Sequence, residues 1–337
     1  MKKNIIIGAF AAILGMVLAV SIVNHMKDDE SGDFTKIDST VEQVMISLFK
    51  SPPAVTDHGW NVDRMIVFVH LLMAVLFVGW SAYFIVVLVK FRQSAHPKAD
   101  YAGVKSKLGT TLAEYGVIVA EVVLIACFAV PLWAEVVNEE EIDKIKKASR
   151  DKKDGLELHI LAKQFDWNAR YAGNDGRFAD QSIEYANKGD NPFGLAPAEI
   201  DSTVDDVVIL SAKSKDNAIV VPWDTPVALK ITSMDVIHSF KVLPLRVCKD
   251  SIPGLQLPIH FKIESKFLKN DDNKPMGGDN DEHVYLITCA QLCGDGHGAM
   301  NGYLKAVHPE KFKEWLKDKS QIEIDKRIEA KGNLASK

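Results

Sequence analysis

Two thiols, an imidazole and a thioether lie together in one short run near the C-terminal end, Cys289-Ala290-Gln291-Leu292-Cys293-Gly294-Asp295-Gly296-His297-Gly298-Ala299-Met300. Soft sulfur ligands beside a histidine suit copper better than they suit calcium, magnesium or manganese. The glycines between these residues would let the backbone fold tightly around a metal ion. The pattern C-x-x-x-C-x-x-x-H-x-x-M therefore indicates a metal site.

Three interpretations of this run are open. With one more histidine, Cys289, Cys293 and His297 would make an ordinary tetrahedral zinc site. A disulfide between the two cysteines is the second interpretation, because the membrane topology described below places them in an oxidising compartment. Copper is favoured over both, because Met300 is a weak ligand that zinc seldom uses and that electron-transfer copper often uses.

A further histidine lies upstream in a strand-like segment, Asp235-Val236-Ile237-His238-Ser239-Phe240. One ligand on a strand and the others on a distant loop is the arrangement that β-sandwich copper proteins use. With His238 added, the two thiolates are one too many for a single blue-copper centre. They suit two copper ions that are bridged by both sulfurs and that each bind one histidine. An electron shared by two metals changes the geometry of each metal little, so its transfer needs little reorganisation.

On these residues the chain resembles subunit II of the haem–copper cytochrome c oxidases, and the site resembles the binuclear copper A centre of that family. The resemblance implies two bridging thiolates, two imidazoles, one thioether and one backbone carbonyl as copper ligands. This chain has a residue at every one of these positions: Cys289, Cys293, His238, His297, Met300 and Gln291.

The position of Gln291 usually holds a glutamate in the family, and the side chain of that glutamate also binds a magnesium ion shared with subunit I. The amide of Gln291 offers an oxygen but carries no charge. The copper role of Gln291 uses its backbone carbonyl and is expected to persist. A magnesium ion at the interface with subunit I is left open.

Three apolar runs stand out, at residues 5–23, 65–89 and 115–137. The second and third are long enough to cross a hydrocarbon core of about 30 Å. The first is either a signal peptide or a first transmembrane helix. The loop between the second and third runs is rich in Lys and Arg, which predicts a cytoplasmic location, and the acidic flanks at 27–63 and 139–141 are expected outside.

The charge pattern sets the predicted domain boundaries and the location of each part. Residues 1–23 are the signal peptide or first helix, 24–64 an external N-terminal segment, 65–137 a transmembrane helix hairpin, 150–320 the copper domain and 321–337 a charged tail. We therefore expect a multi-pass protein of the bacterial inner (plasma) membrane, with the copper domain on the periplasmic side.

Short strand-like runs separated by Gly, Pro, Asn and Asp begin at residue 156, and they lie at 156–165, 206–211, 227–232, 236–243, 283–288 and 303–307. This spacing predicts an antiparallel β-sandwich. The resemblance implies that the fold is an α-helical transmembrane hairpin followed by an all-β cupredoxin-like sandwich. Residues 172–204 read as a long polar insertion, and 310–316 read as a short amphipathic helix before the charged tail.

The resemblance also implies roles outside the copper ligands. Glu114 matches a glutamate at the mouth of the K proton pathway into subunit I, and the alternative is a solvated carboxylate at the membrane surface. Phe165 takes the position of an exposed tryptophan through which electrons enter from cytochrome c. Trp167 is expected to pack near the copper pair, and plain core filling is the alternative for both aromatic residues. Asp235 is expected either to steer a basic cytochrome c or to be a turn residue.

The resemblance thus implies subunit II of a respiratory cytochrome c oxidase, which is the electron-transfer subunit of a proton-pumping oxidoreductase. It would accept electrons from cytochrome c at the binuclear copper centre and pass them to haem in subunit I, where oxygen is reduced. The expected partners are subunits I and III, cytochrome c and membrane lipid. The net charge of −5, without a basic stripe, argues against nucleic acid. The alternative is a membrane-anchored copper or zinc binding protein without an oxidase role.

Overall fold

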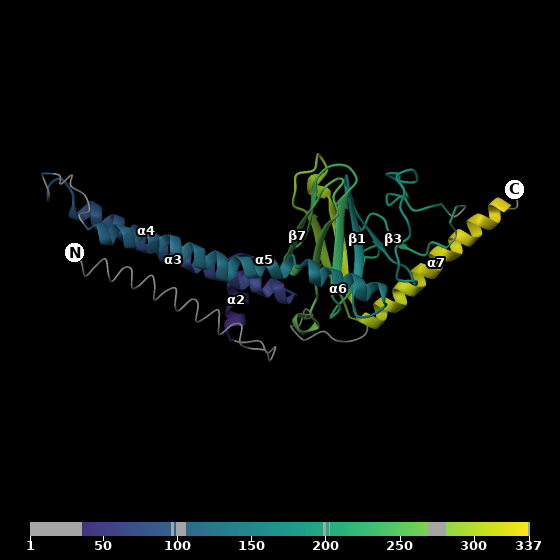
Figure 1. Cartoon of the computed structure of the whole chain (residues 1–337), viewed down its shortest axis with the longest axis horizontal. Helices are drawn as coiled ribbons and strands as arrows, with labels where there is room; N and C mark the ends of the chain where they lie inside the picture. Colours follow the sequence, from purple (N-terminus) through teal and green to yellow (C-terminus); the bar gives the residue numbers. More distant parts are fainter. Residues whose placement is uncertain are drawn as a thin grey trace. The chain divides into compact units, whose positions relative to one another are not determined.

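The computed structural model describes residues 36–95, 98, 106–197, 200–201, 203–268 and 281–335. The chain divides into two compact units, Met1–Lys50 with Asn61–Trp133 and Ser51–Trp60 with Ala134–Lys337. The first unit is helical and the second contains a β-sandwich (Figure 1). The predicted signal peptide or first helix at 1–23 lies outside the described residues.

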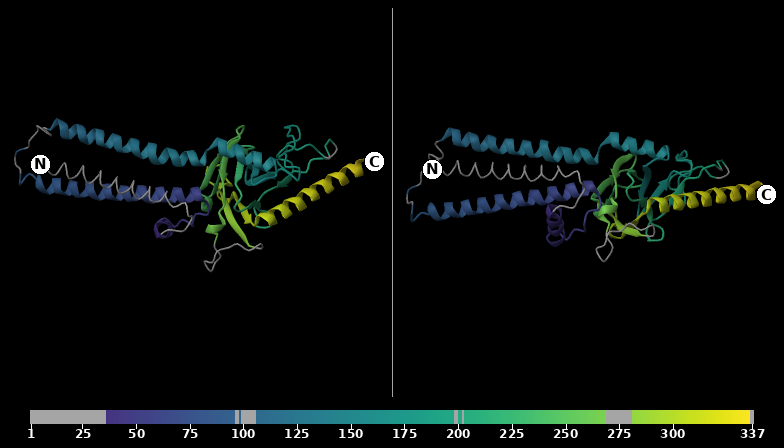
Figure 2. Two further views of the ribbon diagram at one scale, coloured as in Figure 1. Left: turned by 60° about the horizontal axis from the view of Figure 1, so that its bottom comes forward. Right: turned by 90° about the horizontal axis from the view of Figure 1, so that it is seen from below.

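The helical unit contains two long apolar helices that run in opposite directions (Figure 2). Its helices are α2 (Lys36–Ser47), α3 (Asp57–Lys90), α4 (Lys107–Leu124) and α5 (Val130–Val136), with a π-helical turn, η1 (Ile125–Ala129), joining the last two. Two helical runs among the described residues, Asp57–Lys90 and Lys107–Arg150, are long and apolar enough to cross a membrane, and none of their apolar window is buried. A helix that is apolar on all sides and exposed suits lipid rather than water.

Local chemistry explains where the second apolar helix begins and why it changes its winding. Ser106 caps α4, because its side-chain oxygen accepts a hydrogen bond from the Gly109 amide at 3.2 Å. Pro131, near the start of α5, has no amide hydrogen to bond the carbonyl four residues earlier. The π-helical turn directly before it accommodates that missing bond. The rings of Phe68 in α3 and Phe128 in η1 stack with centroids 5.8 Å apart.

The sandwich consists of two five-stranded sheets, ordered β3-β2-β1-β5-β8 and β4-β10-β9-β6-β7. The strands of the first sheet are β1 (Leu156–Lys163), β2 (Asp166–Tyr171), β3 (Val207–Ile209), β5 (Val227–Ser233) and β8 (Leu257–Phe261). The strands of the second are β4 (Ile219–Pro222), β6 (His238–Val242), β7 (Val247–Ser251), β9 (Glu282–Cys289) and β10 (Asn301–Val307). Side chains between the sheets form one core, which includes Ile160, Trp167, Leu229, Phe240 and Ile287.

Two features of the sheets differ from the prediction. The pairs β1–β5 and β4–β10 are parallel, so the sandwich is mixed rather than purely antiparallel. Each parallel pair joins strands that are distant in sequence, because the intervening chain runs through other strands before it returns. Four strands, β2, β4, β7 and β8, lie outside the predicted runs. Strand β2 buries Asn168 and Arg170, so its sequence lacks the apolar alternation that predicts a strand.

Two helices flank the sandwich within its unit. Helix α6 (Glu139–Arg150) is capped by Asn138 and has its glutamates in the first turn and Lys147 and Arg150 in the last, as the helix dipole favours. Helix α7 (Pro309–Ala335) replaces the predicted short helix and charged tail with a single helix (Figure 1). The rings of Phe312 and Trp315 pack against Tyr171 in β2, which explains how α7 is held on the sandwich.

The described residues of the predicted insertion at 172–204 pack against the sandwich. Phe193, Leu195 and Val204 cluster with Leu161 of β1. The guanidinium of Arg170 forms a fully buried ion pair with Asp206 and donates to the carbonyl of Ala179. Two more contacts come from α7, where Arg327 donates to Ala196 at 2.9 Å and Ser320 donates to the carbonyl of Asp205 at 3.0 Å.

The segment before the first span also belongs to the sandwich unit. Residues 51–60 lie inside the predicted external segment 24–64, and they pack against the turn between β6 and β7. The Val55 amide donates to Pro244 at 3.0 Å, and the Thr56 hydroxyl donates to Leu245 at 3.1 Å. This part of the predicted segment is therefore not separate from the domain.

Candidate metal centre

Strands β6 and β9 place the histidine and the first cysteine of the candidate site side by side. Strand β6 begins at His238 and β9 ends at Cys289, and the two strands are antiparallel neighbours with Phe240 opposite Cys289. The Ala290 amide donates to the carbonyl of Ser239 at 3.0 Å, which continues the pairing past the end of β9. The sheet itself therefore brings together two ligands that are far apart in sequence.

The loop between β9 and β10 folds back over this end of the sheet. Gly294 has φ of +126°, a conformation that residues with a side chain rarely adopt. The amides of His297 and Met300 donate to the carbonyls of Gly294 and His297 at 3.0 and 3.2 Å, and His297–Ala299 form a short 3₁₀ turn. Because of these turns, Met300 returns to the core and is fully buried at the start of β10.

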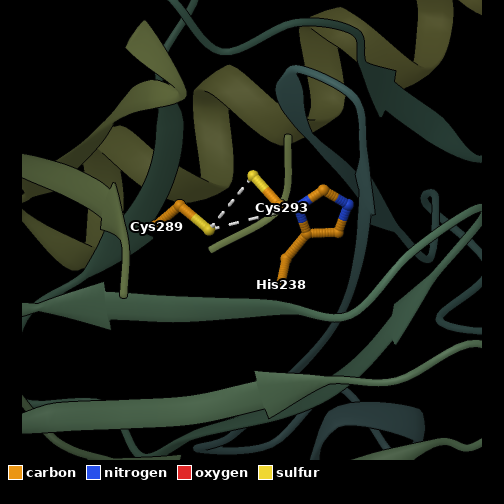
Figure 3. Close-up of side chains that lie close together, drawn as sticks. All are labelled: His238, Cys289 and Cys293. Atoms are coloured by element: carbon orange, nitrogen blue, oxygen red, sulfur yellow. Dashed lines mark hydrogen bonds between the residues drawn. The ribbon is translucent and has the colours of Figure 1, made fainter. Parts of the chain in front are cut away.

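The side chains of His238, Cys289 and Cys293 converge at this end (Figure 3). The two sulfur atoms are 3.8 Å apart, and His238 Nδ1 lies 4.0 Å from Cys289 Sγ. The ligand atoms of these three residues all lie within 4.8 Å of one another, which makes them a candidate metal group. Both cysteines are free, and a sulfur–sulfur distance of about 2.05 Å would be needed for the disulfide alternative.

The other predicted donors approach the same two sulfur atoms. The carbonyl oxygen of Gln291 lies 3.1 Å from Cys289 Sγ. His297 Nδ1 and Met300 Sδ lie 3.6 and 3.7 Å from Cys293 Sγ. Every donor predicted from the motif thus lies within 4.0 Å of one of the two sulfurs. Two thiols, two imidazoles and a thioether are a donor set that fits copper.

Protonation of the Cys293 thiol opposes metal binding until a metal displaces the proton. Burial, together with the hydrogen bond between Cys293 and Cys289, raises the pKa of the Cys293 thiol to about 11. Thiolates rather than thiols bind metals, so binding must release the Cys293 proton to solvent. The site is therefore expected to bind metal more tightly as the pH rises.

Asp235 holds the His238 ring in place. Its Oδ1 lies 2.9 Å from His238 Nε2, and its side chain is only 11% exposed. Burial alone would raise the pKa of Asp235, but hydrogen bonds from the Gln164 amide and from His238 bring this pKa below its usual value. When Nε2–H donates to this carboxylate, Nδ1 is left free on the side of Cys289. The Asp-x-x-His spacing is the sequence signal for this pair, whereas the resemblance predicts only a steering or turn role for Asp235.

Trp167 lies beneath the candidate site and has no exposed surface. Its ring meets His238 edge to face at 6.2 Å and Phe240 at 5.3 Å. Phe165 is half-buried and lies against the loop, where a methyl group added to Gly296 would be 2.5 Å from the ring. The structure thus places both aromatic residues beside the ligands, Trp167 in the core and Phe165 over the loop.

Glu114 and the two other cysteines of the chain are not in this cluster. Glu114 is an exposed residue of α4, in the other unit. Cys127 in the π-helical turn and Cys248 in β7 are exposed free cysteines. Cys248 Sγ has a contact with Ser239 Oγ at 3.7 Å but does not belong to the candidate metal group of the described residues.

Comparison with known proteins shows sequence similarity to the family that the ligand motif resembles. Residues 181–270 match the family "Cytochrome C oxidase subunit II, periplasmic domain". Cytochrome c oxidase subunit 2 of Phytophthora megasperma is 24% identical over 256 residues, which are 76% of this chain and 80% of that protein. Alternative cytochrome c oxidase subunit 2 of Bradyrhizobium diazoefficiens is 27% identical over 163 residues, 48% of this chain and 50% of that protein.

A solved structure also resembles part of the chain. The periplasmic domain of cytochrome oxidase subunit II from Bradyrhizobium japonicum is 20% identical, covers 50% of this chain and 96% of that domain, and has a TM-score of 0.32. The family match and the curated relatives confirm the resemblance to cytochrome c oxidase subunit II that the ligand motif predicts. Two long apolar helices followed by an all-β cupredoxin-like sandwich are confirmed as the fold class.

Proposed function

We propose that this chain is the electron-accepting subunit of a respiratory cytochrome c oxidase and that it holds a pair of copper ions at the end of its sandwich. One observation carries the proposal. Two free sulfur atoms lie 3.8 Å apart, and all other donors named by the motif, at His238, Gln291, His297 and Met300, lie within 4.0 Å of one of them. When bound, the copper pair supplies a carrier that takes up and releases single electrons.

The chain contributes rigidity and a dry environment to this centre. His238 is fixed from behind by Asp235, and Cys289 is fixed by its place at the end of β9. Trp167 and Phe240 exclude water beneath the ligands, because both rings are fully buried. A site whose ligands are held by strands and packed rings moves little when its charge changes, which favours fast electron transfer.

The sandwich and the apolar helices together support a membrane-anchored subunit of an oxidoreductase complex. We assign the membrane to a bacterial inner membrane, with α3 and α4 as spans, the basic loop between them in the cytoplasm and the copper domain in the periplasm. Cytochrome c is the proposed electron donor, haem in subunit I the proposed acceptor, and subunits I and III the proposed partners in lipid.

Three residue roles complete the proposal. Glu114 takes a proton at the cytoplasmic mouth of a pathway into subunit I, where its exposure on α4 leaves it accessible. Phe165 and Trp167 carry electrons toward the ligands, since both rings lie beside the site. Gln291 contributes its backbone carbonyl to copper, and a magnesium ion at the interface with subunit I would use its amide oxygen.

A zinc protein is the second candidate, because His238, Cys289 and Cys293 alone would make three quarters of an ordinary zinc site. The full chain in detergent separates the two. After loading with copper, we expect two copper ions per chain and an electron paramagnetic resonance spectrum of one electron shared by two copper nuclei. A single tightly bound zinc, or a single copper with the spectrum of a mononuclear centre, would reject the proposal.

A further inference from the structure

The turn between β1 and β2 touches the candidate metal centre without supplying a ligand. Residues 164 and 165 form this turn, and Gln164 and Phe165 each contact a different part of the ligand loop. A turn that only connected two strands would need none of these contacts. The contacts therefore point to a role in placing the ligands.

Gln164 joins the two segments that carry the ligands. Its side-chain Nε2 donates to the carbonyl of Cys293 at 2.7 Å. Its backbone amide donates to Asp235 Oδ2 at 2.9 Å, while Oδ1 of the same carboxylate meets His238 Nε2. Gln164 thus holds the loop at Cys293 with its side chain, and with its backbone amide it holds Asp235, which in turn contacts His238.

Phe165 explains one of the glycines in the ligand motif. A methyl group at Gly296 would lie 2.5 Å from the Phe165 ring, which is closer than carbon atoms approach in proteins. Gly296 has φ of −88°, which any residue adopts, so its backbone does not require glycine. The ring, rather than the backbone, excludes a side chain at this position.

We propose that Gln164 and Phe165 are positioning residues that clamp the ligand loop and set the distance between Cys293 and His238. The choice of metal in this inference rests on the proposed function, but the clamp itself does not. The Gln164 bond holds the loop at Cys293, and the Phe165 ring occupies the space beside Gly296, so a shift of the loop must break the first contact or collide with the second.

The first test removes the bond. Gln164→Met keeps the length of the side chain but cannot donate, and Gln181→Met is the matched control. Gln181 Nε2 donates to the carbonyl of Phe193 at 2.8 Å, so it makes the same kind of bond far from the ligand loop in sequence. We expect Gln164→Met to release copper to a chelator at least about tenfold faster and to change the copper hyperfine splitting, whereas Gln181→Met changes neither.

The second test is a double-mutant cycle that adds a methyl group at Gly296 and removes the ring of Phe165. Gly296→Ala alone should release copper at least about tenfold faster, because the methyl group pushes the loop off the ring. Phe165→Ala alone should also release copper faster, because the loop loses its contact with the ring. In the double variant the methyl group has room, so the release rate should be well below the product of the two single effects. If the effects of Gly296→Ala and Phe165→Ala on the copper release rate simply multiply, the proposed contact between ring and loop is wrong. If Gln164→Met releases copper at the same rate as Gln181→Met, the proposed role of the Gln164 bond is wrong.

Cobalt(II) separates failure of the clamp from failure of the proposed function. Thiolate-to-cobalt absorption reports the same ligand loop whether or not the chain holds a copper pair. If the unaltered chain shows no mixed-valence copper signal but Gln164→Met still weakens cobalt binding, the proposed function fails and the clamp stands. If copper behaves as proposed but neither metal responds to Gln164→Met or to the cycle, the clamp fails alone.

Discussion

The metal end of the sandwich and the face that carries the insertion both bury ionisable or reactive side chains, but they satisfy them differently. On the insertion face, Arg170 is paired with Asp206 and a backbone carbonyl, and its guanidinium also lies 5.2 Å from the Phe178 ring. At the metal end, the sulfur atoms of the buried Cys293 and Met300 lie 3.7 Å apart, and the imidazole of His297 lies 3.6 Å from Cys293 Sγ. The first region pairs its buried charge within the chain, whereas the second gathers donors that fit a metal ion.

This difference predicts that ligand changes at the metal end alter loading far more than folding. Cys289→Ser should abolish the mixed-valence copper signal and reduce binding from two copper ions per chain to at most one, because the proposed copper pair would lose one of its two thiolate ligands. The melting temperature of the metal-free chain should stay close to that of the unaltered chain. Cys248→Ser is the control, since Cys248 is exposed on β7. If the mixed-valence copper signal survives Cys289→Ser, the metal end does not hold copper through Cys289, and the proposed difference between the two regions is wrong.

The opposite result is expected on the insertion face. Asp206→Ala leaves the buried Arg170 charge without its partner and should cost about 3–5 kcal/mol of the free energy of unfolding. Copper stoichiometry and spectrum should remain those of the unaltered chain. Urea unfolding of the metal-free chain in detergent measures the first quantity, with the exposed Asp216→Ala as control. Loss of the copper spectrum in Asp206→Ala would mean that the two regions are not independent.

Asp235 tests this comparison further, because it is a partly buried carboxylate that contacts a candidate ligand at the metal end. Asp235→Ala should weaken copper binding by about 10–100-fold, since His238 loses the partner that orients its ring. Asp250→Ala, an exposed acid on the neighbouring strand β7, should leave copper affinity unchanged. Competition with a chelator of known affinity measures both. If the two variants bind copper with equal affinity, Asp235 does not orient His238, and only a turn or steering role is left for it.

The smallest expected effect concerns pH and the insertion face. Burial lowers the pKa of His159, against the raising effect of Glu157, while Lys230 and Arg170 lower it further. Its ring stacks on Phe178 with centroids 3.8 Å apart. The folded state therefore resists protonation of this ring more than the unfolded state does.

The sign of the effect follows from that lowered pKa. The stabilising contribution of neutral His159 is fully present above pH 6.5, the ordinary histidine value, and is lost as the pH falls from there toward the lowered pKa. The loss is at most about 1.4 kcal/mol per pH unit. The contribution of His159 is measured as the difference in the free energy of unfolding between the unaltered chain and His159→Phe at each pH. A difference that does not change between pH 7 and pH 5 would contradict the burial argument.

The elements that the sequence predicted best are those that depend on short-range pattern. The apolar runs found as α3 and α4 follow from hydropathy alone, and the cysteine loop follows from the spacing of its soft donors. Their physics is local, because lipid solvation acts on each side chain and metal ligation acts on a few neighbouring residues. Most of strands β9 and β5 is also predicted, because apolar side chains alternate with polar ones or follow one another along both strands.

What the sequence did not reveal depends on long-range partners. Strand β2 was missed because its buried Arg170 is acceptable only with Asp206, which lies in a distant segment. The contact of Gln164 with Cys293 links residues 129 positions apart, so no local pattern could indicate it. The sequence predicts only a short helix and a tail where α7 lies, because the charged second half of α7 depends on distant contacts such as that of Arg327 with Ala196.

The central claim is that two sulfurs of one loop jointly hold two copper ions. The most direct test is to load the full chain with copper in detergent, count the metal, and record its electron paramagnetic resonance spectrum. We predict two copper ions per chain and a hyperfine pattern from one electron shared equally by both nuclei. A disulfide between Cys289 and Cys293 in the metal-loaded chain, or a spectrum from a single copper nucleus, would contradict the account.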